Sequence, residues 1–327
     1  MAYSVGIIGA GSWGTALAIT VHYAGHRASI WSRNASVVDS INQRHENSEY
    51  LAGVGIPPEI NATTSLEEIV NRDILILAVP AQHLKNQLSH VKIAENVPLV
   101  IASKGIEQNS LMLMSEAVSS ILPNPIAIIS GPNFAKETAL LKPTATTIAC
   151  ENAELGEKLL TVFGSKTFRP YLARDIITTQ IAGAVKNVIA IACGISEGKE
   201  LGDNSKSAII TRSIAEIKRL CLAKGGQSET LMGLAGIGDL ILTCSSRKSR
   251  NMSLGYELGQ GKELDEILAT RNTVAEGVTT AKSVFELAKK LGVEMPICEA
   301  VYSILYEKSD INETIIKLLN RPYKNEH

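Results

Sequence analysis

The chain has 327 residues, enough for two domains with full hydrophobic cores, and 45% of its residues are hydrophobic. Its 32 basic and 33 acidic residues leave a net charge of -1, which argues against an extended nucleic-acid surface and against a polybasic membrane patch. Five scattered cysteines without a CxxC pair, six histidines without metal-ligand spacing, and no secretory signal before the first predicted strand indicate a cytoplasmic protein with reduced thiols and no metal site.

The first predicted elements are a strand at residues 5–8, a glycine turn, and a helix that ends at Gly25. The turn reads Gly9-Ala10-Gly11-Ser12-Trp13-Gly14, so a GxGxxG pattern lies between strand and helix, as in dinucleotide-binding folds. Gly9 would make the tight turn, Gly11 would let a pyrophosphate approach, and Gly14 would let the helix pack on the strand. The N–H groups at the helix N-terminus would bind the phosphates. A structural glycine turn is the alternative, which the strand–turn–helix context disfavours.

The second predicted strand covers residues 27–31 and leads into Ser32-Arg33-Asn34. An NAD-specific site usually has an acid near the end of this strand, where it binds the ribose 2′-hydroxyl. Here Arg33 stands instead of an acid, and a guanidinium suits a 2′-phosphate. The sequence therefore favours NADPH, or the use of both NADPH and NADH. The alternative is that Arg33 is a solvated loop residue.

Further strands and helices alternate up to residue 175, which predicts a doubly wound α/β domain. The predicted strands cover residues 73–80, 97–103, 126–130, 145–150 and 167–172, with helices at 82–91 and 153–163. Ligands of such sheets bind beyond the carboxyl ends of the strands. Lys104 and the Gly131-Pro132-Asn133 turn follow two of these ends and are candidate site residues. An ordinary surface position is the alternative for Lys104.

A helix predicted at residues 176–197 is almost wholly apolar and has Lys186 as its only charged residue before Glu197. Small or amide side chains are expected on the side of Lys186: Gly183, Asn187, Ala190 and Gly194. A buried ammonium is costly unless it is paired or used. Two interpretations remain open, a catalytic amine in a cleft and a lysine that extends its amine to solvent. A membrane span is disfavoured because polar residues interrupt a segment barely long enough to cross a bilayer.

Residues 176–327 are predicted to form an all-helical second domain. Its further helices are expected at residues 205–223, 276–291, 296–307 and 312–320. Asp239 lies in a glycine-rich apolar segment, and Ser249-Arg250-Asn251 follows in a basic one. A hydroxyl, a guanidinium and an amide together suit a small phosphate, above all if a helix begins near Met252. From spacing alone a solvated charged turn is the favoured alternative.

Seven motifs together resemble the bacterial type of NAD(P)-dependent glycerol-3-phosphate dehydrogenase, over essentially the whole chain. They are GAGSWGTALA (9–18), SKGIE (103–107), SGPNFAKE (130–137), GAVKNVIAIA (183–192), GLAGIGDLILTC (233–244), SRN (249–251) and VAEG (274–277). The resemblance implies a Rossmann-type domain followed by a helical domain like that of 6-phosphogluconate dehydrogenase. It also implies reversible reduction of dihydroxyacetone phosphate to sn-glycerol 3-phosphate, for phospholipid synthesis, by a cytoplasmic homodimer.

The resemblance also assigns roles to individual residues. It implies that Lys186 is the general acid/base. The implied substrate-binding residues are Lys104, Gly131, Asn133, Lys186, Asp239, Ser249, Arg250 and Asn251. The implied contacts with NADPH or NADH are Gly9, Gly11, Ser12, Trp13, Gly14, Arg33, Tyr50, Lys104, Ala135, Arg250, Val274 and Glu276. Burial and Lys104 would lower the pKa of Lys186 while Asp239 would raise it, and the sequence leaves the balance open.

Two segments depart from the family pattern. Asn133 stands where GP[ST]FA has a hydroxyl residue, and residues 199–204 differ from the usual glycine- and phenylalanine-containing loop. Three other functions remain as alternatives. A dehydrogenase of hydroxy acids or sugar acids would need no phosphate on its substrate. A non-catalytic cofactor sensor would have no reason to keep Lys186, and a pure scaffold would explain neither the glycine turn nor Lys104.

Overall fold

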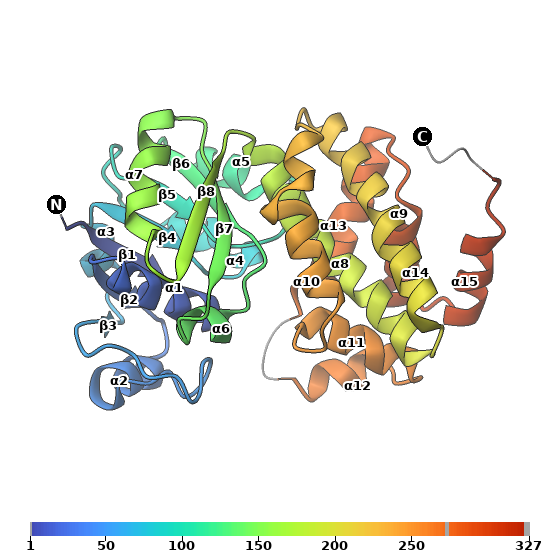
Figure 1. The fold of residues 1–327 in the computed structure, drawn as a ribbon, viewed down its shortest axis with the longest axis horizontal. Helices are drawn as coiled ribbons and strands as arrows, with labels where there is room; N and C mark the ends of the chain where they lie inside the picture. The colour runs from blue at the N-terminus through green and yellow to red at the C-terminus, as the bar shows by residue number, and fades with distance from the viewer. Residues whose placement is uncertain (1, 272–274, 324–327) are drawn as a thin grey trace.

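The computed structural model describes residues 2–271 and 275–323, which form a sheet-containing lobe and a helical lobe side by side (Figure 1). The first lobe holds an eight-stranded sheet in the order β3-β2-β1-β4-β5-β6-β7-β8. Its strands are β1 (Ser4–Ile8), β2 (Arg27–Trp31), β3 (Asn61–Thr63), β4 (Ile74–Leu77), β5 (Leu99–Ile101), β6 (Ile126–Ser130), β7 (Thr144–Ala149) and β8 (Phe168–Ala173). This is a doubly wound Rossmann-type sheet, and the predicted fold class is confirmed.

The six strands from β1 to β6 run parallel, so their carboxyl ends meet at one edge of the sheet. β7 pairs antiparallel to β6, and β8 pairs parallel to β7. All four residues of β4 are buried, as expected for a central strand covered on both faces. The glycine turn after β1, Lys104 after β5 and Gly131 after β6 therefore share the carboxyl edge.

Seven helices accompany this sheet among the described residues. They are α1 (Ser12–Tyr23), α2 (Ala35–Arg44), α3 (Leu66–Val70), α4 (Ala81–Leu88), α5 (Met114–Ser119), α6 (Ala135–Ala139) and α7 (Ala153–Phe163). Sequence analysis did not predict α2, α3, α5, α6 or β3. Four of these five elements have six residues or fewer, and so short a segment shows little periodicity. The fifth, α2, has ten residues, but only four of them are buried, so its apolar pattern is weak as well.

The helical lobe is built around α8 (Ile176–Gly198), which packs against five other helices of the lobe. The remaining helices are α9 (Gly202–Ala223), α10 (Asp239–Cys244), α11 (Arg250–Gly259), α12 (Leu264–Ala269), α13 (Glu276–Leu291), α14 (Pro296–Tyr306) and α15 (Ile311–Leu319). By length and composition α8 could cross a membrane, but 83% of its most apolar window is buried inside the structure. That burial is typical of the core helix of a globular fold.

Glycines of α8 and of α11 let these two helices approach each other's backbone closely. A Cβ at Gly194 would lie 2.2 Å from the Met252 carbonyl oxygen, and one at Gly255 would lie 2.1 Å from the Ile191 carbonyl oxygen. Gly194 therefore serves the packing of α8 against α11. Gly183 does face the junction of the lobes, since a Cβ there would lie 3.0 Å from Ser130 Oγ. The small residues serve helix packing as well as access to Lys186.

The segment after β5 joins the two lobes. Ile106 and Leu113 are fully buried among the side chains of the helical core. The backbone N–H of Ser115 donates to Gln180 Oε1 at 2.9 Å, and Lys224 pairs with Glu116 at 2.7 Å. These contacts hold α8 against the carboxyl edge of the sheet, which places Lys186 near Lys104.

Candidate active site

The glycine turn after β1 has the geometry that a dinucleotide requires. Gly9 has φ +120°, a conformation that L side chains rarely adopt, and a Cβ at Gly14 would lie 1.9 Å from the Gly9 carbonyl oxygen. A Cβ at Gly11 would meet nothing within 4 Å, so space is open beside the N-terminus of α1. A pyrophosphate fits this space, where the backbone N–H groups of the helix face it.

Two side chains beside this turn also suit a bound cofactor. The Nε1 atom of Trp13 is buried without a hydrogen-bond partner in the described residues, and a ligand would supply one. The Ser12 hydroxyl donates to the Tyr50 carbonyl at 2.5 Å, which brings Tyr50 to the turn. Ala135 begins α6, which packs against α1. The residues present therefore fit a nicotinamide dinucleotide.

The loop between α2 and β3 covers this site, and a residue that sequence analysis missed anchors it. Asn47 is fully buried and donates to the Ala10 carbonyl at 2.8 Å and to the Thr15 hydroxyl at 2.9 Å. The side-chain Oδ1 of Asn47 accepts from the N–H of Tyr50 at 3.1 Å. Arg33 is exposed at the end of β2 on the same side. An asparagine in a loop gave no signal of this role in the sequence.

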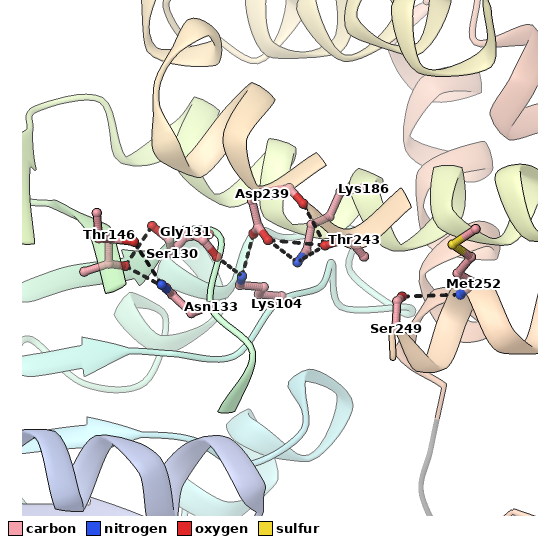
Figure 2. A network of polar contacts seen from close by, with 11 residues as sticks. Lys104, Ser130, Gly131, Asn133, Thr146, Lys186, Asp239, Thr243, Ser249 and Met252 are labelled. Carbon is pink, nitrogen blue, oxygen red and sulfur yellow. Dashed lines mark hydrogen bonds and ion pairs between the residues drawn. The ribbon is translucent and has the colours of Figure 1, made fainter. Parts of the chain in front are cut away.

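At the lobe junction, Lys186, Asp239 and Lys104 form a buried charge cluster (Figure 2). Lys186 Nζ lies 2.5 Å from one carboxylate oxygen of Asp239, and Lys104 Nζ lies 2.6 Å from the other. The side chain of Asp239 is 1% exposed and that of Lys186 is 10% exposed. The interpretation that Lys186 extends its amine to solvent is therefore wrong. Two ammonium groups share one carboxylate, so the cluster keeps one net positive charge.

Burial lowers the pKa of Lys186 to about 8. The carboxylate of Asp239 opposes this decrease, and the ammonium of Lys104 adds to it. The balance that the sequence left open thus favours a lowered pKa. An amine with a pKa near neutrality is able both to donate and to accept a proton at physiological pH.

An irregular segment of the helical lobe positions Asp239. A π-helical turn, η2 (Leu234–Gly238), leads directly into α10, and Asp239 is the first residue of α10. One turn later, the hydroxyl of Thr243 accepts from Lys186 Nζ at 2.9 Å and donates to the Asp239 carbonyl at 2.7 Å. Sequence analysis missed Thr243, although its spacing of four from Asp239 places both on one helix face.

The turn after β6 contacts the cluster through its backbone. The Gly131 carbonyl accepts from Lys104 Nζ at 3.4 Å. Asn133 instead reaches β7, because its amide donates to the Ala145 carbonyl at 2.9 Å and accepts from the Thr146 hydroxyl at 3.0 Å (Figure 2). One N–H of the Asn133 amide remains for a ligand.

Two residues of the Ser249-Arg250-Asn251 segment make structural contacts. The Ser249 hydroxyl accepts from the Met252 N–H at 3.3 Å and caps α11, apart from the Lys186 cluster (Figure 2). The helix begins at Arg250, two residues before the position considered in the sequence. Asn251 Oδ1 accepts from the N–H of Gly277 at 3.0 Å, which leaves the Asn251 NH2 group for a ligand.

Glu276 connects this segment to the charge cluster. Burial raises the pKa of Glu276, while the positive charges of Arg250, Lys104 and Lys186 oppose the rise. Glu276 thus lies within electrostatic range of all three positive side chains, of which Arg250 is exposed. Val274, which the family pattern assigns to the cofactor, lies outside the described residues.

Within residues 2–271 and 275–323, no group of three histidine, cysteine or acidic side chains is placed to hold a metal ion. All five cysteines are buried and free.

The fold and site define a class, the two-domain nicotinamide-dependent dehydrogenases: a dinucleotide-type glycine turn in a Rossmann-type lobe, and a buried lysine where a helical lobe meets the sheet. Comparison with known proteins resolves the family within that class. The profile described as NAD-dependent glycerol-3-phosphate dehydrogenase N-terminus matches residues 4–156, and the C-terminus profile of that name matches residues 175–316. The chain belongs to this dehydrogenase family and is an oxidoreductase that uses NAD(P).

Individual relatives agree with this assignment over nearly the full chain. Glycerol-3-phosphate dehydrogenase [NAD(P)+] of Parvibaculum lavamentivorans is 46% identical over 98% of this chain and 98% of its own length. The same enzyme of Maricaulis maris is 48% identical over 98% and 97%. The crystal structure of glycerol-3-phosphate dehydrogenase from Coxiella burnetii superposes with a TM-score of 0.94, at 35% identity, over 98% and 99% of the two chains.

Proposed function

We propose that this chain catalyses the reversible reduction of dihydroxyacetone phosphate to sn-glycerol 3-phosphate with NADPH or NADH. The observation that carries this proposal is the buried pairing of Lys186 with Asp239 at the carboxyl edge of the sheet, on the side of the glycine turn. When bound, the nicotinamide cofactor supplies or accepts a hydride at C2 of the substrate. The residues of the chain must then bind the substrate, orient it and move one proton.

Lys186 is proposed as the group that moves this proton. In reduction, its ammonium donates a hydrogen bond to the carbonyl oxygen, where negative charge grows, and then delivers the proton. In oxidation, the neutral amine removes the proton from the hydroxyl. With a pKa of about 8, Lys186 populates both forms near neutral pH.

Asp239 and Lys104 are proposed to orient and tune Lys186. The Asp239 carboxylate holds both ammonium groups at 2.5 and 2.6 Å; with their contacts to Thr243 and Gly131, each keeps one N–H for a substrate oxygen. The positive charge that the cluster retains favours an anionic transition state. A substrate bound beside Gly131 would also meet the free N–H of Asn133.

A phosphate is proposed to bind beside Arg250 and Asn251 at the N-terminus of α11. Among the described residues the Arg250 guanidinium has no hydrogen bond or ion pair, and the Asn251 NH2 group is free. The N-terminal N–H groups of α11, beside Ser249, favour an anion. Binding of the remote phosphate would hold C2 in the reacting geometry and so convert binding energy into rate.

Further parts of the proposal concern the setting of the enzyme. It is proposed to act in the cytoplasm as a homodimer that supplies glycerol 3-phosphate for phospholipid synthesis. The division into a cofactor domain at residues 1–175 and a substrate domain at residues 176–327 is likewise proposed. It is supported by the change from sheet to helices at α8.

The test is oxidation of NADPH and of NADH, followed at 340 nm, with purified protein. Dihydroxyacetone phosphate should support turnover, and unphosphorylated dihydroxyacetone should not, because it lacks the group that Arg250 and Asn251 are proposed to bind. Equal rates with the two ketones, or turnover with hydroxy acids alone, would contradict the proposal.

A further inference from the structure

The carboxyl end of β2 acquires an acid from a distant loop. The strand is followed by Ser32, Arg33 and Asn34, none of which is acidic. In the folded chain, however, the Asn34 amide donates to Glu49 Oε2 at 3.0 Å. Glu49 belongs to the loop between α2 and β3. A carboxylate therefore stands where Rossmann-type sites bind the ribose of adenosine.

Residues on both sides of Glu49 in the sequence are hydrogen-bonded to the glycine turn or the residues beside it. Buried Asn47 ties the loop to the Ala10 carbonyl at 2.8 Å, and the Ser12 hydroxyl donates to the Tyr50 carbonyl at 2.5 Å. The glycine turn and the loop thus form one unit. Glu49 lies between these two anchors, so its carboxylate is held near the cofactor site although it is exposed.

Glu49 and Arg33 place opposite charges at this end of the site. Both act on the same phenol: a hydrogen bond to Glu49 raises the pKa of Tyr50, while the positive charge of Arg33 lowers it. Both side chains are exposed, and among the described residues Arg33 has no ion-pair partner. The guanidinium attracts a 2′-phosphate, and the carboxylate repels one and accepts from a 2′-hydroxyl.

We propose that Glu49 is a cofactor-specificity residue that opposes Arg33, so that the enzyme accepts NADH as well as NADPH. Glu49 disfavours the 2′-phosphate by charge and favours the 2′-hydroxyl by hydrogen bonding. The proposal rests on the use of a nicotinamide dinucleotide, and it does not depend on the identity of the substrate.

Nucleotide binding to the full-length protein tests this role without turnover. Adenosine 5′-monophosphate and adenosine 2′,5′-bisphosphate differ by the 2′-phosphate, and calorimetric titration gives a Kd for each. In Glu49→Gln, the ratio of these affinities should shift toward the bisphosphate by about fivefold at low ionic strength, because one repulsive charge is removed. The ratio of kcat/KM for NADPH to that for NADH should rise in parallel.

Glu95→Gln is the matched control, because it changes the charge equally. Glu95 is exposed just before β5, where the parallel strands begin, whereas the cofactor site lies where they end. The proposal is supported if Glu49→Gln shifts the ratio of the two nucleotide affinities at least about threefold more than the control does. A smaller shift overturns it. Failure of the substrate assignment would leave the nucleotide affinities unaffected, so the two proposals fail independently.

Discussion

The substitution Asp239→Asn tests the electrostatic role of the charge cluster. The carboxylate lies 2.5 Å from Lys186 Nζ and 2.6 Å from Lys104 Nζ, so its loss leaves two ammonium groups without a counter-charge. An opposite charge at such range changes a pKa by about 1–3 units. The pKa of Lys186, about 8 in the native protein, should therefore fall to about 6 in the variant. At pH 7 the protonated fraction of Lys186 would decrease from about 90% to about 10%, which is close to a tenfold loss of the proton donor.

The assay for this prediction is kcat for ketone reduction at saturating substrate and NADPH. It covers about pH 5.5 to 9, a range that includes the pKa of Lys186 in the native protein, about 8, and in the variant, about 6. In the native enzyme kcat should fall as pH rises through about 8, because the neutral amine cannot donate a proton. In Asp239→Asn the same limb should move to about pH 6. Thr243→Val is the control: it removes the neutral acceptor of a Lys186 hydrogen bond and should move the limb much less. A limb at unchanged pH in Asp239→Asn would refute the reasoning, even if kcat were lower.

Two further substitutions test packing and burial. Gly194→Ala should lower the free energy of unfolding by about 2 kcal/mol, because its Cβ would lie 2.2 Å from the Met252 carbonyl oxygen. Urea denaturation measures the loss, and Gly55→Ala, where a Cβ meets nothing within 4 Å, should change it little. Glu216→Gln concerns a carboxyl group whose pKa burial raises to about 7. Its stabilising contribution is full below the unfolded pKa of about 4.5 and is lost as pH rises through about 7, by up to about 3 kcal/mol. Thermal midpoints from pH 5 to 8 should therefore fall more steeply in the native protein than in the variant; parallel slopes would argue against this burial effect.

The long, strongly patterned elements of this fold could be predicted from the sequence. The helix at residues 276–291 and the strands at 27–31 and 126–130 have the predicted limits, because apolar periodicity and capping residues mark them. Lys186 was identifiable since a lone charge on an apolar helix must be paired or used. Lys104 was a candidate from its position after a predicted strand, whereas Asp239, which comes from a distant part of the chain, was suggested by resemblance.

The residues that sequence analysis missed act through distant contacts. Asn47 and Glu49 lie in a loop with little pattern, yet they reach the glycine turn and the end of β2 across the fold. Thr243 was missed because its role depends on the π-helical turn before Asp239, for which a single sequence gives no reliable signal. The packing role of Gly194 was not predicted, because helix periodicity alone does not reveal which neighbouring helix requires close approach.

The central claim is that Lys186 exchanges a proton with the substrate oxygen, and Lys186→Ala tests it most directly. The measurement is kcat for dihydroxyacetone phosphate reduction at saturating cofactor, with the Kd of NADPH determined in parallel to confirm an intact cofactor site. A decrease in kcat of at least about a hundredfold, the usual size of a general acid/base contribution, with little change in the Kd of NADPH, is the predicted result. Near-normal turnover in this variant would contradict the assignment of Lys186 and the mechanism that depends on it.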